Sequence, residues 1–118
     1  MNVQRGDVVL VDYPYTAGRT AKVRPVLVVQ NDRDNQRLRN TIVVQITSMT
    51  QRALEPTQLS IEMAAPEGKQ SGLRQDSVVN GVNLLTLDKS KILRKIGSLP
   101  KSTMQQVNHC LKVVLALS

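Results

Sequence analysis

Three polar side chains stand at the ends of two apolar runs in this chain. Arg24 opens the run Arg-Pro-Val-Leu-Val-Val, while Thr47 and Ser48 close the run that starts at Thr41. A guanidinium and two hydroxyls are the donors that a phosphate needs when negative charge builds on its oxygens in a transition state. A structural explanation stays open beside this one. An arginine at a strand start often pairs with a carboxylate, and hydroxyls after a strand often satisfy a turn.

The elements that must position these side chains are short strands. Apolar, β-branched runs bounded by glycine, proline or asparagine predict six of them, at residues 7–13, 24–30, 41–47, 57–62, 76–87 and 92–99. In the fifth, Asn80-Gly81 predicts a bulge, because a glycine inside a strand often marks one. Such closely spaced strands followed by one helix predict a mainly β fold, an antiparallel barrel of SH3-like size with a C-terminal helix.

The segments between these strands are polar. Residues 14–23 combine Pro, Gly and Thr with Arg19 and Lys22, so they predict an exposed basic loop. Residues 31–40 are predicted to be a polar connection, and residues 64–73 a glycine-containing loop. Basic side chains on an exposed loop favour an anionic ligand.

Residues 101–117 are the one segment with helical periodicity, and their apolar stripe is predicted to pack on the barrel. The stripe consists of Met104, Val107, Leu111, Val114 and Leu115. Val113 points away from it, either as a scattered surface valine or as part of a subunit interface.

The same helix carries the chain's single histidine and single cysteine. His109 shares a face with Gln105 and Lys112, which predicts a solvated side chain rather than a general base. Cys110 lies beside the apolar stripe without an activating neighbour, so we expect a packing residue rather than a nucleophile. The sequence shows no metal-ligand spacing, no phosphate-binding glycine loop and no nucleophile elbow, and we expect no metal and no cofactor.

Length and charge narrow the class of protein. A chain of 118 residues predicts one domain, spanning residues 1–118. The net charge of +7, from 16 Lys and Arg against 9 Asp and Glu, favours a polyanionic partner such as nucleic acid. A lone cysteine excludes an internal disulfide, and the N-terminus is polar with no long apolar run. We therefore expect a cytoplasmic protein without a membrane segment.

Four blocks of the chain, in order, carry a resemblance to a known family. They are Arg5 to Asp12; Gly18 leading to Arg24-Pro25 and its strand; Ile46-Thr47-Ser48; and Asp76-Ser77-Val78-Val79 continuing through residues 84–90 into Ile96-Gly97 and the Met104 helix. Each block is degenerate, whereas their order and spacing are specific. Over nearly its full length the chain resembles the MazF/PemK (Kid-like) endoribonuclease toxins of type II toxin–antitoxin systems.

This resemblance implies a dimeric SH3-like barrel that cuts single-stranded RNA at short sequences without metal, leaving a 2′,3′-cyclic phosphate and a 5′-hydroxyl. It also implies neutralisation by a cognate antitoxin protein. The family's catalytic pair falls on Arg24 and Thr47, and Ser48 would support the transition state. Two loops would flank the RNA, contributing Tyr15, Arg19, Lys22, Thr50, Gln51 and Arg52.

The residues themselves agree with part of this chemistry. RNA supplies its own nucleophile, the 2′-hydroxyl, so the protein needs to position the phosphate and stabilise its charge. Arg24 is suited to a bidentate grip on the non-bridging oxygens. A guanidinium is an inefficient base, so an acid or base role for this arginine is what the resemblance implies.

The chain also departs from the family pattern. Many relatives carry a glutamate soon after the loop glycine, where this chain has Arg19-Thr20-Ala21 after Gly18. Many carry an acid-glutamine pair and an arginine where Val82-Asn83 and Leu85 stand here. Asn83 keeps an amide for reading a base edge, and we expect the target sequence to differ.

Two other functions remain open at this point. A CcdB-type topoisomerase poison shares the barrel, but it acts through a protein partner and leaves the Arg24 and Thr47 pair unexplained. A non-catalytic barrel that binds RNA or an antitoxin fits the charge of +7 and the missing carboxylates.

Overall fold

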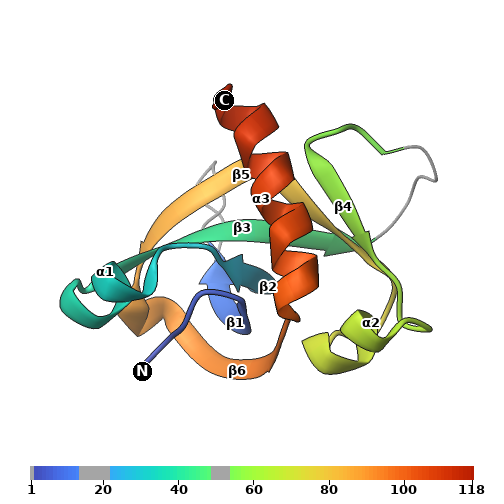
Figure 1. Ribbon diagram of the computed structural model, residues 1–118. Coiled ribbons are helices and arrows are strands. Elements are labelled where there is room, and N and C mark those ends of the chain that lie inside the picture. Colours follow the sequence, from blue (N-terminus) through green and yellow to red (C-terminus); the bar gives the residue numbers. More distant parts are fainter. Residues whose placement is uncertain (1, 14–21, 49–53) are drawn as a thin grey trace.

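A computed structural model describes residues 2–13, 22–48 and 54–118 of the chain (Figure 1). Six strands are present: β1 (Asp7–Tyr13), β2 (Lys22–Val28), β3 (Asn40–Ser48), β4 (Gln58–Ile61), β5 (Ser77–Asp88) and β6 (Ile92–Ser98). The helices are α1 (Asp32–Arg37), α2 (Pro66–Ser71), the short 3-10 helix η1 (Lys89–Lys91) and α3 (Lys101–Leu115). The predicted strands all exist, with ends that differ by one or two residues.

The strands form one antiparallel sheet in the order β4-β5-β3-β2-β1-β6. In Figure 1 the sheet curls behind α3, which lies across it. Within the described residues β4 and β6 are edges, so the barrel is open rather than closed. The prediction of a mainly β, SH3-like fold with a C-terminal helix is confirmed.

Strand alternation divides the apolar side chains between the two faces of the sheet. On one face they pack against α3, in a core that includes Val8, Leu27, Val44, Val79 and Val107. On the other they form a second core that includes Val9, Val26, Val28, Val43 and Leu87. Because both faces of β1, β2 and β3 are buried, these strands read as nearly continuous apolar runs.

The predicted bulge in β5 is present. Gln45 of β3 pairs with Asn80, whereas the preceding Val44 pairs with Leu84, so residues 81–83 lie outside the ladder. A side chain at Gly81 would place its Cβ atom 2.7 Å from the carbonyl oxygen of Thr57. The bulge therefore needs a glycine where β5 passes beneath the start of β4.

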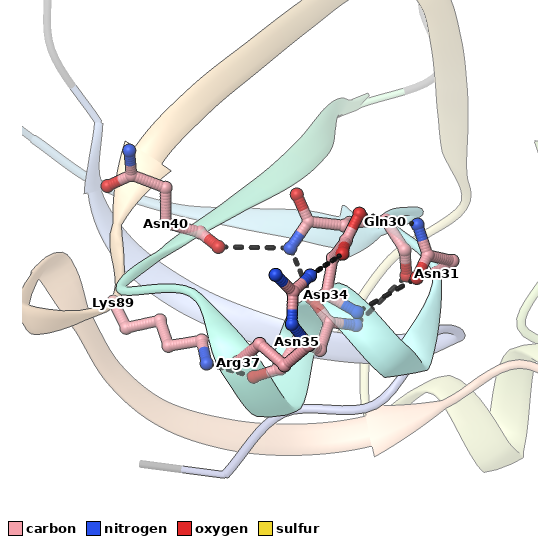
Figure 2. A network of polar contacts seen from close by, with 7 residues as sticks. All are labelled: Gln30, Asn31, Asp34, Asn35, Arg37, Asn40 and Lys89. Carbon is pink, nitrogen blue, oxygen red and sulfur yellow. Dashed lines mark hydrogen bonds and ion pairs between the residues drawn. The ribbon is translucent and has the colours of Figure 1, made fainter.

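The predicted connection at residues 31–40 contains α1, which the sequence pattern did not reveal. The side chain of Asn31 caps the helix by accepting a hydrogen bond of 2.9 Å from the amide of Asp34. Behind the helix lies a network of buried polar side chains (Figure 2). Asn35 joins Gln30 through bonds of 2.9 Å in each direction and accepts one of 2.7 Å from Thr41.

The predicted loop at residues 64–73 contains α2. Pro66 opens the helix and Gly72 ends it in the left-handed region, at φ +75°. A Cβ atom at Gly72 would lie 2.0 Å from the carbonyl oxygen of Ile96, and one at Gly97 would lie 2.4 Å from that of Gln70. These two glycines allow the backbones of α2 and β6 to touch.

The C-terminal helix differs from its prediction in one respect. Met104 and Val107 are buried and Leu111 packs on the same core, but Leu115 is 52% exposed. The helix ends at Leu115 rather than at residue 117. No helix in the described ranges is long and apolar enough to cross a membrane.

Candidate active-site cavity

A cavity of about 1080 Å³ opens where β2 and β3 separate. Its lining comes from four parts of the fold: Leu10 of β1; Arg24 and Pro25 of β2; Gln45 to Ser48 of β3; and the segments 72–75, 77 and 94–96 around α2, β5 and β6. All three side chains that the sequence singled out at strand ends, Arg24, Thr47 and Ser48, are among these residues.

Strand register explains why Arg24 and Thr47 belong to one site. The β2–β3 ladder runs from Val28 opposite Val43 to Val26 opposite Gln45. Arg24 and Thr47 lie two residues beyond the last pair of this ladder, and side-chain alternation puts them on the same side of their strands as Val26 and Gln45. The guanidinium and the hydroxyl are therefore delivered to the cavity from neighbouring strands.

Ser48 is held by the segment that follows α2. The side-chain amide of Gln75 donates a hydrogen bond to the Ser48 hydroxyl oxygen. Gln75 is itself fixed, since its carbonyl oxygen accepts a bond of 2.8 Å from the buried Ser77 hydroxyl. With its oxygen already accepting, the Ser48 hydroxyl has its hydrogen available for a ligand.

The charge around the cavity is positive. Arg24, Arg74, Arg94 and Lys95 line it, and none of the described lining residues is a carboxylate. One of these cations is committed elsewhere, because the Lys95 ammonium forms an ion pair of 3.2 Å with the buried Asp7. Such a lining favours an anionic ligand.

Two other predicted RNA contacts lie near the cavity without lining it. Lys22 is exposed at the start of β2, opposite Tyr13, so it belongs to a strand and not to the predicted loop. Asn83 projects from the β5 bulge, and its amide donates a hydrogen bond of 2.6 Å to the side chain of Gln45. Gln45 does line the cavity, so Asn83 reaches the site through it.

Five predicted contact residues, Tyr15, Arg19, Thr50, Gln51 and Arg52, lie outside the described residues. Conversely, sequence reasoning missed Gln45, Arg74, Gln75 and Arg94 as lining residues. The proline and glycine that bracket α2 were a usable signal for that helix. No local sequence pattern predicts that the end of α2 contacts β6.

The titratable residues of α3 take no part in this site. His109 is exposed on the helix, as predicted, and Cys110 is buried, as predicted. Burial raises the pKa of the Cys110 thiol, which keeps it protonated and unreactive at neutral pH. Among the described residues no three His, Cys, Asp or Glu side chains gather closely enough to hold a metal ion.

Comparison with known proteins places this geometry in a family. The family model described as the PemK-like, MazF-like toxin of type II toxin–antitoxin systems matches residues 4–115. The chain is 37% identical to the endoribonuclease EndoA of Bacillus subtilis (strain 168) over 118 residues, covering 99% of this chain and 97% of the relative.

Solved structures share the fold. An endoribonuclease in complex with its cognate antitoxin, from a mycobacterial species, has a TM-score of 0.78 at 24% identity, covering 98% of this chain and 97% of that one. The Mycobacterium tuberculosis toxin MazF-mt6 has a TM-score of 0.76 at 25% identity, covering 95% of this chain and 98% of that one. The chain therefore belongs to the PemK-like, MazF-like toxins of type II toxin–antitoxin systems.

Proposed function

We propose that this chain, an endoribonuclease toxin of a type II toxin–antitoxin system, cuts single-stranded RNA at the cavity bounded by Arg24 and Thr47. The observation that carries the proposal is the cavity lining, to which neighbouring strands contribute the guanidinium of Arg24 and the hydroxyl of Thr47 beside further cations. These groups suit a phosphate better than a neutral ligand.

The reaction needs no nucleophile from the protein. The RNA 2′-oxygen attacks the neighbouring phosphorus while the bond to the 5′-oxygen breaks, which leaves a 2′,3′-cyclic phosphate and a 5′-hydroxyl. One proton passes from the 2′-hydroxyl to solvent and one passes from solvent to the departing oxygen, so the step is balanced without an added co-reactant. Arg24 binds the non-bridging oxygens, and the Thr47 and Ser48 hydroxyls donate to them as their charge rises.

The direct test incubates purified protein with a long single-stranded RNA in EDTA and maps the cut ends. We expect cuts at defined sequences with 2′,3′-cyclic phosphate ends. Arg24→Ala should lower the rate about a hundredfold to a thousandfold, the loss expected for one transition-state donor. Arg33→Ala, at an exposed arginine of α1 outside the cavity, is the matched control and should cut normally.

The outcomes separate the remaining functions. RNA that stays intact at stoichiometric protein would refute the proposal and favour a non-catalytic barrel. Cutting that survives Arg24→Ala unchanged would refute the catalytic assignment. Retained RNA binding in a variant that no longer cuts would show that the arginine acts on the transition state.

RNA is not the only partner that we propose. A solved relative is in complex with its cognate antitoxin, and the exposed cations of this cavity suit an acidic segment of such a protein. We place the protein in the cytoplasm, where its RNA substrate is found. Pull-down with the product of a neighbouring reading frame, with and without competing RNA, tests whether both partners use the cavity.

We further propose that the chain is a homodimer. Val113 and Leu117, in and after the last turn of α3, are 42% and 59% exposed. Val82 of the β5 bulge is 57% exposed, and the bulge approaches this turn because a Cβ atom at Gly81 would lie 3.1 Å from Val114. These apolar side chains suit an interface between two copies. Val113→Asp should shift the sedimenting species to a monomer.

A further inference from the structure

Two arginines line the cavity away from Arg24. Arg74 follows α2, and Arg94 lies in the middle of β6. Both are exposed, and neither guanidinium forms a hydrogen bond or an ion pair with any other described residue. Lys95, by contrast, is paired with Asp7 at 3.2 Å. The cavity therefore contains two guanidinium groups that the fold itself does not use.

Strand order sets the distance between these arginines and the scissile site. Leu10 of β1 pairs with Pro25 on one side and with Arg94 on the other. Two strand spacings thus separate the backbones of Pro25 and Arg94, about 10 Å. Because a full strand lies between β2 and β6, we expect Arg94 to contact a different phosphate from the one at Arg24.

Arg74 is brought to the same end of the cavity by the contact between α2 and β6. Gly72 lies against the backbone of Ile96, and Gly97 lies against Gln70 and Ser71. Ser71 is fully buried, and its hydroxyl oxygen accepts a hydrogen bond of 3.1 Å from the amide of Leu73. The segment that carries Arg74 is thus held against β6 by its backbone.

The cavity lining also includes apolar side chains. Leu10, Leu73 and Ile96 line the cavity and are half-buried there. Apolar surface beside cations suits a single strand, in which charged phosphates flank sugars and bases.

We propose that Arg74 and Arg94 form a subsite for a second phosphate of the RNA strand whose scissile phosphate lies at Arg24. This subsite rests on the proposed function and adds a length requirement to it. A strand that ends close to the scissile bond cannot reach both ends of the cavity, whereas a longer one can. These two arginines select for the length of the RNA and do not take part in the chemistry at the scissile phosphate.

The test uses two RNAs built around a mapped cut site. One extends several nucleotides to each side of the cut, and the other ends next to the scissile phosphate on both sides. Arg74→Gln and Arg94→Gln should each raise KM for the long RNA about threefold to tenfold with kcat unchanged. Neither should alter cleavage of the short RNA. Arg33→Gln removes the same charge from α1 and should leave both RNAs unaffected.

Salt dependence gives a second readout. For binding of the long RNA, replacing both Arg74 and Arg94 by glutamine should reduce the slope of log affinity against log salt by about 0.7, the change for one phosphate on a single strand. Versions of the long RNA extended only on the 5′ side or only on the 3′ side will show which side the subsite holds.

Several outcomes would overturn the subsite. One is that Arg74→Gln and Arg94→Gln behave as Arg33→Gln does on the long RNA. Another is an equal loss on both RNAs, which would place these arginines at the scissile phosphate. Normal RNA kinetics with weakened binding of poly-glutamate would assign the surface to an acidic protein instead. If the wild type does not cut at all, the proposed function fails, and the salt slopes still decide whether the two arginines bind RNA.

Discussion

Polar side chains lie at both ends of the β2–β3 pair, but they are buried at one end and exposed at the other. At the end near α1, Gln30, Asn35 and Thr41 are buried, and Asn35 is hydrogen bonded to both of the others; Figure 2 shows the bond between Asn35 and Gln30. At the other end, Arg24, Ser48 and the neighbouring arginines are exposed around a cavity. The same two strands thus carry a closed polar cluster and an open one.

The two ends differ in where the hydrogen-bond partners of their polar groups come from. In the buried cluster nearly every donor finds an acceptor within the protein, as burial demands. Around the cavity, none of the described lining residues is a carboxylate, and the guanidinium groups of Arg74 and Arg94 have no partner among the described residues. The first arrangement stabilises the fold, and we propose that an anionic ligand binds at the second. The two ends should therefore respond to mutation in different measurements.

The largest expected effect is on catalysis at the open end. Thr47→Val keeps the shape and β propensity of the side chain but removes the hydroxyl group that lines the cavity together with Arg24. We expect kcat to fall about a hundredfold, as for other transition-state donors, with an unchanged melting temperature. Single-turnover cleavage measures kcat, and thermal unfolding measures the melting temperature. A melting temperature that fell in parallel with kcat would contradict the view that the open end serves catalysis and the closed end serves stability.

The converse effect is on stability at the closed end. Asn35→Ala leaves buried groups of Gln30 and Thr41 without partners, and we expect a loss of about 2–4 kcal/mol in the free energy of unfolding. Urea unfolding measures it. The neighbouring Gln36 is exposed, so Gln36→Ala should change stability by less than about 0.5 kcal/mol. Cleavage by the folded fraction of Asn35→Ala should stay normal.

A smaller effect tests how the open end is held. Gln75→Ala removes the amide that orients the Ser48 hydroxyl, and we expect kcat to fall about threefold to tenfold. In a Ser48→Ala background the same substitution should do nothing further, because the hydroxyl is gone. Gln70→Ala is the control: Gln70 donates a bond of 3.2 Å to Ser98 and does not line the cavity. Additive losses would contradict the positioning role.

The smallest effect concerns neither end. The raised pKa of Cys110 means that the folded state holds its thiol proton more tightly than the unfolded state does. This contribution to stability is fully present below the ordinary thiol pKa of 9.0 and is lost as pH rises through the folded value. Cys110→Ser should flatten the decline of stability above that pH. Cleavage at neutral pH should survive thiol alkylation reagents.

The sequence predicted the open end better than the closed one. Apolar, β-branched runs with glycine, proline or asparagine at their ends located the strands, and Arg24 and Thr47 stood out because one precedes and the other ends such a run. The two short helices escaped detection because six residues give no helical period, although Asn31 and the pair Pro66 and Gly72 mark their ends. The wall formed by Arg74 and Arg94 depends on a contact between segments distant in sequence, which no local pattern encodes.

The glycine contact between α2 and β6 has a practical consequence. Gly97 touches neither Arg24 nor Thr47, yet a methyl group there would collide with the backbone of Gln70 and Ser71. Gly97→Ala would act as a wedge that moves one wall of the cavity while the strands bearing Arg24 and Thr47 stay paired. The activity of Gly97→Ala would then depend on how closely the backbones of α2 and β6 can pack. This variant is a candidate for a temperature-sensitive allele of the toxin.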